Sequence, residues 1–250
     1  MLRKILLGSV SLIITVLLAQ ESPASLLLIL NDISTPGADV VVLDDLASGA
    51  VSDTGSWTST IGDTSSDAGQ VQFNGSVGSF NVNVTTGLSS PTIGNNTLQL
   101  NSVSVSGAPG TLELWLIDTD FVDNTWTFNT QFGGTTTGAV SFASFVDADN
   151  QEGSFDSEYV YAPGVALEYE APYASDGAFS FNESADNIVA GDDSFSLALG
   201  VLIEHDDAGD VTAFSARLSQ VPEPGALAVW SVLAMGMLLP KRRRKSNVIR

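Results

Sequence analysis

Residues 194–218 read SFSLALGVLIEHDDAGDVTAFSARL and contain the plainest structural pattern in the chain. Apolar side chains occupy every second position of the first half, at Phe195, Leu197, Leu199, Val201 and Ile203. That period of two is the mark of a β-strand with one buried face. The acidic segment DDAGD at 206–210 has the glycine and aspartates of a turn, and a second alternating run follows it. We therefore expect two strands joined as a β-hairpin.

The same alternation recurs through residues 25–220, separated by clusters of Gly, Asn, Asp, Ser and Pro. GSFNVNVTT at 78–86 and TLELWLI at 111–117 alternate regularly, whereas LQLNSVSVS at 98–106 changes parity before Val103, which predicts a bulge. Further strands are expected at 26–30, 40–43, 71–73, 126–128, 140–146, 159–161 and 165–169. The pattern predicts an all-β chain with a single β-sandwich, jelly-roll-like, over residues 25–220. A β-barrel or β-solenoid is the alternative, and the lack of a fixed repeat argues against the solenoid.

The N-terminal residues 1–24 read as a secretory signal peptide. Arg3 and Lys4 precede the apolar run ILLGSVSLIITVLLA at 5–19, the order of a positive n-region and an h-region. Cleavage is expected after Ala24, with Ala19 as the second choice. An uncleaved membrane anchor is the alternative, but the run is short for a stable span.

The C-terminal residues 221–250 combine three features in a fixed order. VPEP at 221–224 excludes regular helix and leaves an extended, exposed backbone. GALAVWSVLAMGMLL at 225–239 has no charge, and as a helix it would cover roughly 22 Å, short of a hydrocarbon core of about 30 Å. A basic stop follows and should stay on the cytoplasmic side, with residues 246–250 as a cytoplasmic tail. The stop consists of Lys241, Arg242, Arg243, Arg244 and Lys245.

This order of motif, short apolar helix and basic stop resembles the PEP-CTERM sorting signal of bacterial surface and exopolysaccharide-associated proteins. The resemblance covers residues 221–245 and implies processing by a membrane-embedded exosortase near the motif Val221, Pro222, Glu223 and Pro224. It implies a protein that is exported, held briefly in the membrane by its C-terminal helix, and then placed at the cell surface or outside the cell. A tail anchor that is never processed is the alternative.

The N-terminal half also resembles an ectodomain type found in that group. The similar segments are GQVQFNGSVGSFNVNVTTG at 69–87 and TLELWLIDTDF at 111–121, within a span of about 26–122. This second resemblance implies placement among exported surface proteins and no particular activity.

The charge distribution excludes several kinds of partner. The chain has 29 acidic and 9 basic residues, for a formal net charge of −20. All the acidic residues except Glu21 and Glu223 lie within 25–220, where Arg217 is the one basic residue. Nucleic acid is therefore not expected as a partner, because phosphate binding needs clustered Lys and Arg. Cysteine is absent, which excludes thiol catalysis, disulfides and thiolate metal sites.

Catalytic chemistry finds little support in the sequence. His205 is the single histidine, and it stands beside Asp206 at an expected turn, where solvent exposure explains it without a Ser-His-Asp triad. So many acidic residues make a close carboxylate pair probable by chance, so glycoside hydrolysis would need a buried pair in a groove. Trp57, Trp115 or Trp126 would be expected to line such a groove. We expect no enzyme activity.

Calcium is the metal that the sequence favours, because it prefers oxygen ligands and extracellular sites bind it at millimolar levels. Two acidic segments are candidates, DADNQEG at 147–153 and DTDFVD at 118–123, although neither has EF-hand spacing. Solvated loops are the simpler interpretation of both. The candidate ligands are Asp147, Asp149, Glu152, Asp118, Asp120 and Asp123.

The sequence favours a noncatalytic surface or extracellular matrix protein with a structural or adhesive role. The second hypothesis is a secreted carbohydrate-binding module, with calcium as a candidate ion that assists binding and a polysaccharide or the matrix as partner. That second function requires either an exposed aromatic platform or a concave sheet face with polar ligands. No organic cofactor is expected.

Overall fold

The computed structural model describes residues 26–35, 39–44, 60–65, 67–89, 96–122, 127–150, 154–155, 160–161, 165–174, 176–185 and 194–221. Every regular element within these ranges is a β-strand, and the strands are numbered β1 to β15. None of the described residues belongs to a helix with the length and hydropathy needed to span a bilayer. The expected signal peptide and the sorting helix lie outside the described residues.

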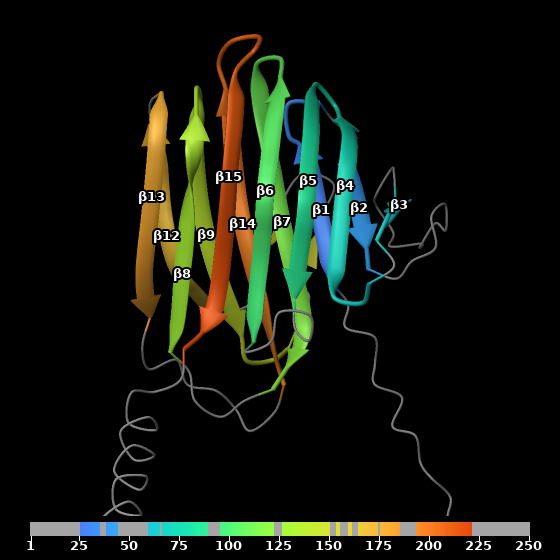
Figure 1. The fold of residues 1–250 in the computed structure, drawn as a ribbon, viewed down its shortest axis with the longest axis vertical. Coiled ribbons are helices and arrows are strands. Elements are labelled where there is room, and N and C mark those ends of the chain that lie inside the picture. The colour runs from blue at the N-terminus through green and yellow to red at the C-terminus, as the bar shows by residue number, and fades with distance from the viewer. Residues whose placement is uncertain are drawn as a thin grey trace, which may run out of the picture.

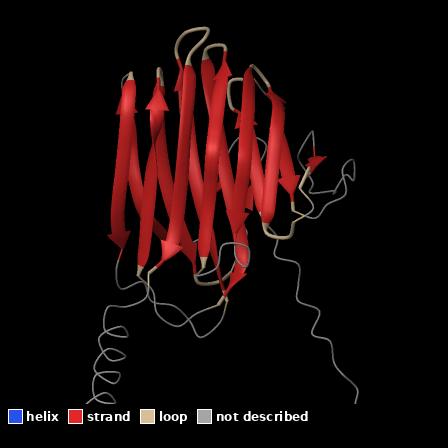
Figure 2. Ribbon diagram, viewed as in Figure 1, coloured by secondary structure: helices blue, strands red, loops and turns tan. Residues whose placement is uncertain are grey.

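Two sheets pack face to face, so the predicted β-sandwich is confirmed (Figures 1 and 2). The seven-stranded sheet has the order β12-β9-β14-β7-β1-β2-β3, and the six-stranded sheet has the order β13-β8-β15-β6-β5-β4. Pairing is antiparallel except between β2 and β3. The seven-stranded sheet comprises β1 (Leu27–Asp32), β2 (Asp39–Leu43), β3 (Thr60–Gly62), β7 (Gly110–Phe121), β9 (Ala139–Asp147), β12 (Val165–Ala174) and β14 (Phe195–His205). The six-stranded sheet comprises β4 (Gln70–Val77), β5 (Phe80–Ser89), β6 (Thr97–Gly107), β8 (Phe128–Thr136), β13 (Gly177–Ala185) and β15 (Val211–Gln220), and β10 (Ser154–Phe155) pairs only with β11 (Val160–Tyr161).

The predicted hairpin between β14 and β15 is wrong in its pairing. β14 bonds with β7 and β9, whereas β15 bonds with β6 and β8 in the other sheet. Residues 206–210 therefore cross the sandwich as an arch, and the two strands face each other across the core. Both strands have one apolar face, and local alternation is the same whether two strands share a sheet or oppose each other.

Three other connections cross between the sheets at the same end, from β6 to β7, from β8 to β9 and from β12 to β13. We call this the arch end, which is the upper end in Figure 1. Neighbouring arches are joined there, because the amide of Thr137 donates to the carbonyl of Val211 at 3.0 Å and the amide of Val211 donates to Thr137 Oγ1 at 2.8 Å. β1 begins and β15 ends at the opposite end, which we call the terminal end (Figure 1).

The core between the sheets is filled by the inward residues of both. Phe132 of β8 stacks on Phe142 of β9 with ring centroids 4.6 Å apart, so the two sheets are joined by aromatic packing near the β12–β13 edge. The five alternate residues of β14 noted above are all buried. The bulge expected in β6 is confirmed, with Ser102 at a φ of 49° and a register shift opposite it in β15.

The outer face of the seven-stranded sheet holds a second apolar cluster. Its buried members are Leu27, Ile29, Val41, Trp115, Ile117 and Ala198. Gly200 leaves room for the Trp115 ring, since a Cβ built there would lie 2.6 Å from two of its carbons. β14 is consequently buried on both faces over most of its length.

Some strands extend beyond the sequence pattern. The expected strand at 126–128 begins only at Phe128 and continues to Thr136 through Gly133 and Gly134. β3, β10 and β13 were not expected, and β13 is an edge strand with a polar outer face. Glycine pairs and polar edge strands carry little apolar periodicity, which explains both omissions.

Candidate functional site

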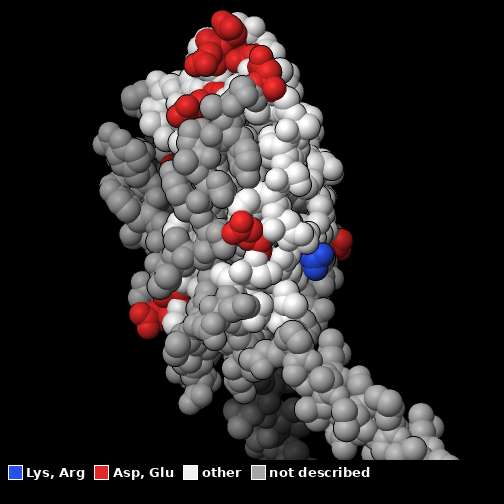
Figure 3. Space-filling model, turned by 90° about the vertical axis from the view of Figure 1, so that its left-hand side faces the viewer, with Lys and Arg blue, Asp and Glu red and all other residues white. Residues whose placement is uncertain are grey.

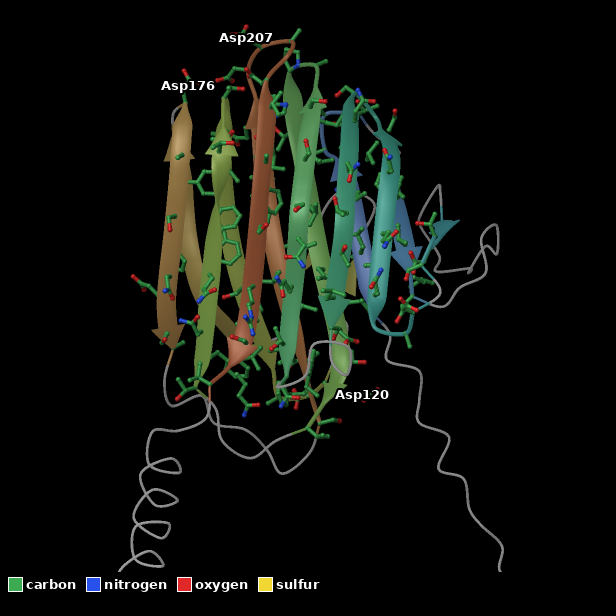
Figure 4. The ribbon with its side chains drawn as sticks, viewed as in Figure 1. Asp120, Asp176 and Asp207 are labelled. Atoms are coloured by element: carbon green, nitrogen blue, oxygen red, sulfur yellow. The ribbon has the colours of Figure 1, made fainter. Side chains whose placement is uncertain are left out.

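The two acidic segments expected to bind calcium meet at the terminal end. Asn150 Oδ1 accepts a hydrogen bond from the backbone amide of Asp120 at 2.8 Å, and Asn150 Nδ2 donates to Asp120 Oδ1 at 2.8 Å. Asp120 is exposed, and its φ of 64° places it in the left-handed region. Figure 4 shows Asp120 at this end, opposite Asp176 and Asp207. The structure thus joins the segments through an aspartate–asparagine pair.

The remaining predicted calcium ligands are not brought together around Asp120 in the described part of the chain. Asp147 is buried, and its Oδ1 accepts from the amide of exposed Asp149 at 3.1 Å, a turn-forming bond. Asp123 and Glu152 lie outside the described residues. Within the ranges described, no three His, Cys, Asp or Glu side chains are grouped so that they could hold a metal ion.

Asp118 points into the interior, on the same face of β7 as Leu114 and Leu116. Its Oδ2 accepts from the Ser89 hydroxyl, and its Oδ1 accepts from the amide of Thr119 at 2.8 Å. Burial raises the pKa of this carboxyl to about 7, against the opposing effect of the two hydrogen bonds. Asp118 therefore serves as a buried link between β7 and β5.

Two further carboxylates at the terminal end, not singled out from the sequence, also bond to the backbone. Asp63 Oδ1 accepts from the amides of Ser65 at 2.9 Å and Gln72 at 3.0 Å. Asp44 Oδ2 accepts from the amide of Gly69 at 2.5 Å. These bonds fix the chain as it enters β4.

His205 is buried, with 2 % of its surface exposed, so the expected solvent exposure is wrong. It occupies the inward parity of β14 and packs on Phe80 with ring centroids 5.5 Å apart. Its Nε2 lies 3.1 Å from Thr212 Oγ1, which in turn lies 2.8 Å from Thr136 Oγ1. Burial lowers the pKa of the imidazole. The histidine is a core residue beneath the 206–210 arch.

The sorting motif begins where the sandwich stops. β15 ends at Gln220, and the amide of Val221 donates to the carbonyl of Thr127 at 2.8 Å. Val221 is the last described residue and is partly exposed. Pro222, Glu223, Pro224 and the basic stop lie outside the described residues.

The outer face of the six-stranded sheet has an unusual composition for so acidic a chain. Its described outward positions carry amides, hydroxyls, small residues, Arg217 and the apolar residues Leu88 and Val211, without Asp or Glu. Exposed Glu183, on the edge strand β13, has the inward parity of Phe179 and Phe181. Figure 3 shows acidic side chains gathered at the arch end and a single basic side chain far below that end, at a height where fewer acidic side chains are seen.

A depression of about 470 Å³ lies on this face, across β13, β8, β15 and β6. It shares Gly133 and Ser215 with a second depression of about 350 Å³ that continues toward Ser104. We call the two together the polar trough. Gly133 keeps its centre open, because a Cβ there would have no contact closer than 3.4 Å. The polar trough is lined by Gln99, Ser102, Ser104, Gln131, Gly133, Ser180, Asn182, Ala213, Ser215 and Arg217, with backbone and buried side chains beneath.

Strand register places the longest polar side chains of the trough in one row. Arg217 of β15 pairs with Gln131 of β8 and with Gln99 of β6, and Gln131 pairs with Asn182 of β13. Residues directly opposite in an antiparallel pair point to the same face, about 5 Å apart. Three amide side chains and a guanidinium, all of them groups that can form hydrogen bonds, therefore lie in one row across four strands.

No aromatic platform accompanies this row among the described residues. Phe132 and Phe181 border the trough but are buried. Trp115 lies on the opposite sheet, 8 % exposed, with its Nε1 donating to Glu113 Oε1 at 2.8 Å. Trp57 and Trp126 lie outside the described residues. Of the two arrangements expected for carbohydrate binding, the described face offers only the polar one.

Comparison with known proteins adds little to this description. No family model matches the chain, and no curated protein matches it. A solved structure with a similar arrangement is TmCBM61 in complex with beta-1,4-galactotriose, at a TM-score of 0.30 and 11% sequence identity. The match covers 57% of this chain and 88% of that chain. A likeness at this level leaves the function to be argued from the chain itself.

Proposed function

We propose that this protein is an exported, noncatalytic surface or extracellular matrix component that an exosortase processes at its C-terminus. The supporting observation is the position of the motif at 221–224, directly after the last residue of β15. β15 is held on both sides, by β6 and β8, up to Ser219 or Gln220. Cleavage within the motif would remove the membrane helix and the basic stop without taking any residue from the sheet.

Mass spectrometry of the mature protein from an exosortase-containing host tests this proposal. The expected product ends near Pro222–Pro224 and lacks residues 241–245. A Pro222→Ala, Pro224→Ala variant should keep the whole C-terminus and remain in the membrane fraction, while a Ser219→Ala control is processed normally. Wild-type protein that retains its basic stop in the host would overturn the proposal.

Carbohydrate binding by the polar trough is the second candidate function. The observation in its favour is the acid-free outer face of the six-stranded sheet, with the row formed by Asn182, Gln131, Arg217 and Gln99. Amide and hydroxyl groups both donate and accept, as sugar hydroxyls do, and an open trough suits a chain rather than a single sugar.

Calorimetric titration of the full chain with an oligosaccharide panel tests the second candidate. A Gln131→Ala, Asn182→Ala variant should bind at least about tenfold more weakly, since two net hydrogen bonds contribute on the order of 1 kcal/mol each. Asn74→Ala, on the same face at β4 and outside the trough, should bind as the wild type does. Binding that survives the double change would place the site elsewhere.

Calcium assistance remains part of this second proposal. The joined segments around Asp120 and Asp147 supply oxygen atoms of the kind that calcium prefers. A rise in melting temperature at millimolar calcium, reversed by a chelator, is the expected result. An unchanged melting temperature would remove calcium from the proposal.

A further inference from the structure

Arg217 is the one basic residue between Lys4 and Lys241, and it lines the larger of the two depressions of the polar trough. β15 is flanked by β8 and β6, and Arg217 has an amide side chain opposite it on each, Gln131 and Gln99. Along its own strand the outward neighbours are Ser215 and Ser219. The guanidinium is exposed at the centre of an uncharged polar surface.

The guanidinium has no carboxylate partner among the described residues, although the body carries so many acids. The nearest described carboxylate along the sheet is Glu183 of β13, which has the inward parity of that strand and lies two strands away from Arg217. Other exposed carboxylates lie at the arch end, such as Asp176 and Asp207, and at the terminal end, such as Asp120 (Figure 4). In a chain this acidic, an isolated arginine on an acid-free face keeps its charge available for a ligand.

We propose that the polar trough binds an anionic polysaccharide, with a carboxylate or sulfate group of the ligand on Arg217 and sugar hydroxyls on the flanking amides. This inference rests on carbohydrate binding by the trough. The planar fork of arginine matches the two oxygens of such a group and forms paired, charge-assisted hydrogen bonds. Gln99 and Gln131 lie on either side of that fork, where hydroxyls of the same sugar would be placed.

The charge of the rest of the protein gives the proposal a distinctive salt dependence. The negative body repels an anionic chain over about 30 Å at 0.01 M salt but over only about 8 Å at 0.15 M. The direct contact with Arg217 is far shorter than either distance. Binding is therefore expected to be weaker at 0.01 M than at 0.15 M salt, the reverse of the order for a basic protein.

The experiment is a calorimetric titration of the full chain with three matched oligosaccharides. They are oligogalacturonate, its neutral carboxyl-reduced form, and a sulfated derivative of that reduced form. Wild-type protein should prefer one or both charged forms by at least about tenfold, as one charge-assisted bond would give. Arg217→Gln should abolish the preference, which is measured as the ratio of the affinities for the charged and neutral forms within each protein. Arg217→Lys should keep part of the preference, and Asn74→Ala should keep all of it.

The outcomes separate this inference from the carbohydrate-binding function itself. Equal affinity for all three oligosaccharides, or a preference that survives Arg217→Gln, overturns the anionic ligand and leaves carbohydrate binding intact. No binding to any oligosaccharide overturns both. Because Arg217 is exposed and has no ion pair to lose within the described residues, both arginine variants should fold, which circular dichroism checks.

Discussion

The outer face of the seven-stranded sheet holds a buried apolar cluster, whereas that of the six-stranded sheet presents mainly amides, hydroxyls and one guanidinium to solvent. Ile29 and Ala198 on the first have no exposed surface, while Asn83 and Ser215 occupy exposed positions on the second. Both sheets share the same core, and β12, β9, β14 and β7 of one are each adjacent in sequence to β13, β8, β15 and β6 of the other. The outward side chains thus distinguish a sheet whose outer face is buried at its apolar cluster from a sheet whose outer face is largely exposed to solvent.

The largest expected difference between the two faces is in stability. Ile29→Ala, on the covered face, removes a fully buried side chain and should lower the free energy of unfolding by about 2–5 kcal/mol. Ser104→Ala, on the open face, should change it by less than about 0.5 kcal/mol. Urea denaturation measures both. Equal effects would show that the two faces are not differently covered.

The buried carboxyl of Asp118 in the seven-stranded sheet should make stability depend on pH. Its pKa rises from 3.8 to about 7 on folding. At pH values between these two, the folded state keeps a proton that the unfolded state has released. Stability from this group is therefore lost as pH rises from about 4 to about 7, by up to about 4 kcal/mol at roughly 1.4 kcal/mol per unit.

Asp118→Asn should remove that loss, because an amide accepts from Thr119, donates to Ser89 and does not ionise. Thermal unfolding of the two proteins from pH 4 to pH 8 makes the comparison. The lowered pKa of His205 acts in the opposite direction near pH 6.5 and is common to both proteins, so it cancels in the difference. Parallel pH profiles would show that Asp118 is ionised in the folded protein.

Alanine substitutions of one glycine on each sheet should have the smallest effects on stability, and the two effects should have opposite signs. Gly200→Ala should lower the free energy of unfolding by about 1–3 kcal/mol, because the new Cβ would lie 2.6 Å from the Trp115 ring. A Cβ at Gly133 would lie at ordinary contact distances from its neighbours. Gly133→Ala should therefore raise the free energy of unfolding by about 0.4–1 kcal/mol, because alanine lowers the conformational entropy of the unfolded chain. The same Gly133→Ala change should weaken oligosaccharide binding, because it narrows the polar trough. A destabilising Gly133→Ala would mean that its site is not open.

The fold class followed from sequence because alternation over many short segments is a local property. Phe195 to Ile203 showed which residues face the core, and all five do. The pairing did not follow, because an arch at 206–210 and a hairpin there require the same turn residues. Only the partners of β14, namely β7 and β9, distinguish the two, and they lie far away in sequence.

The candidate site was harder to predict than the core. Arg217 was noticed as an isolated charge, but its significance depends on Gln99 and Gln131, which strand register brings beside it. The acidic neighbours of His205 favour solvent exposure, and that prediction is wrong. The parity that His205 shares with Ile203 places it on the buried face of β14. The signals present in the sequence are the parity of His205 with Ile203 and the absence of Asp and Glu from the strand faces around Arg217.

The arrangement of β15 also has a mechanical consequence. A pull on the chain beyond Val221 acts along the axis of a strand that is bonded on both sides, by β6 and β8. Antiparallel bonds run perpendicular to the strand, so such a load shears two full ladders at once instead of peeling bonds one by one. A body attached to a surface through this end would resist detachment by flow, and its arch end, with Asp207, would be the part presented to the surroundings.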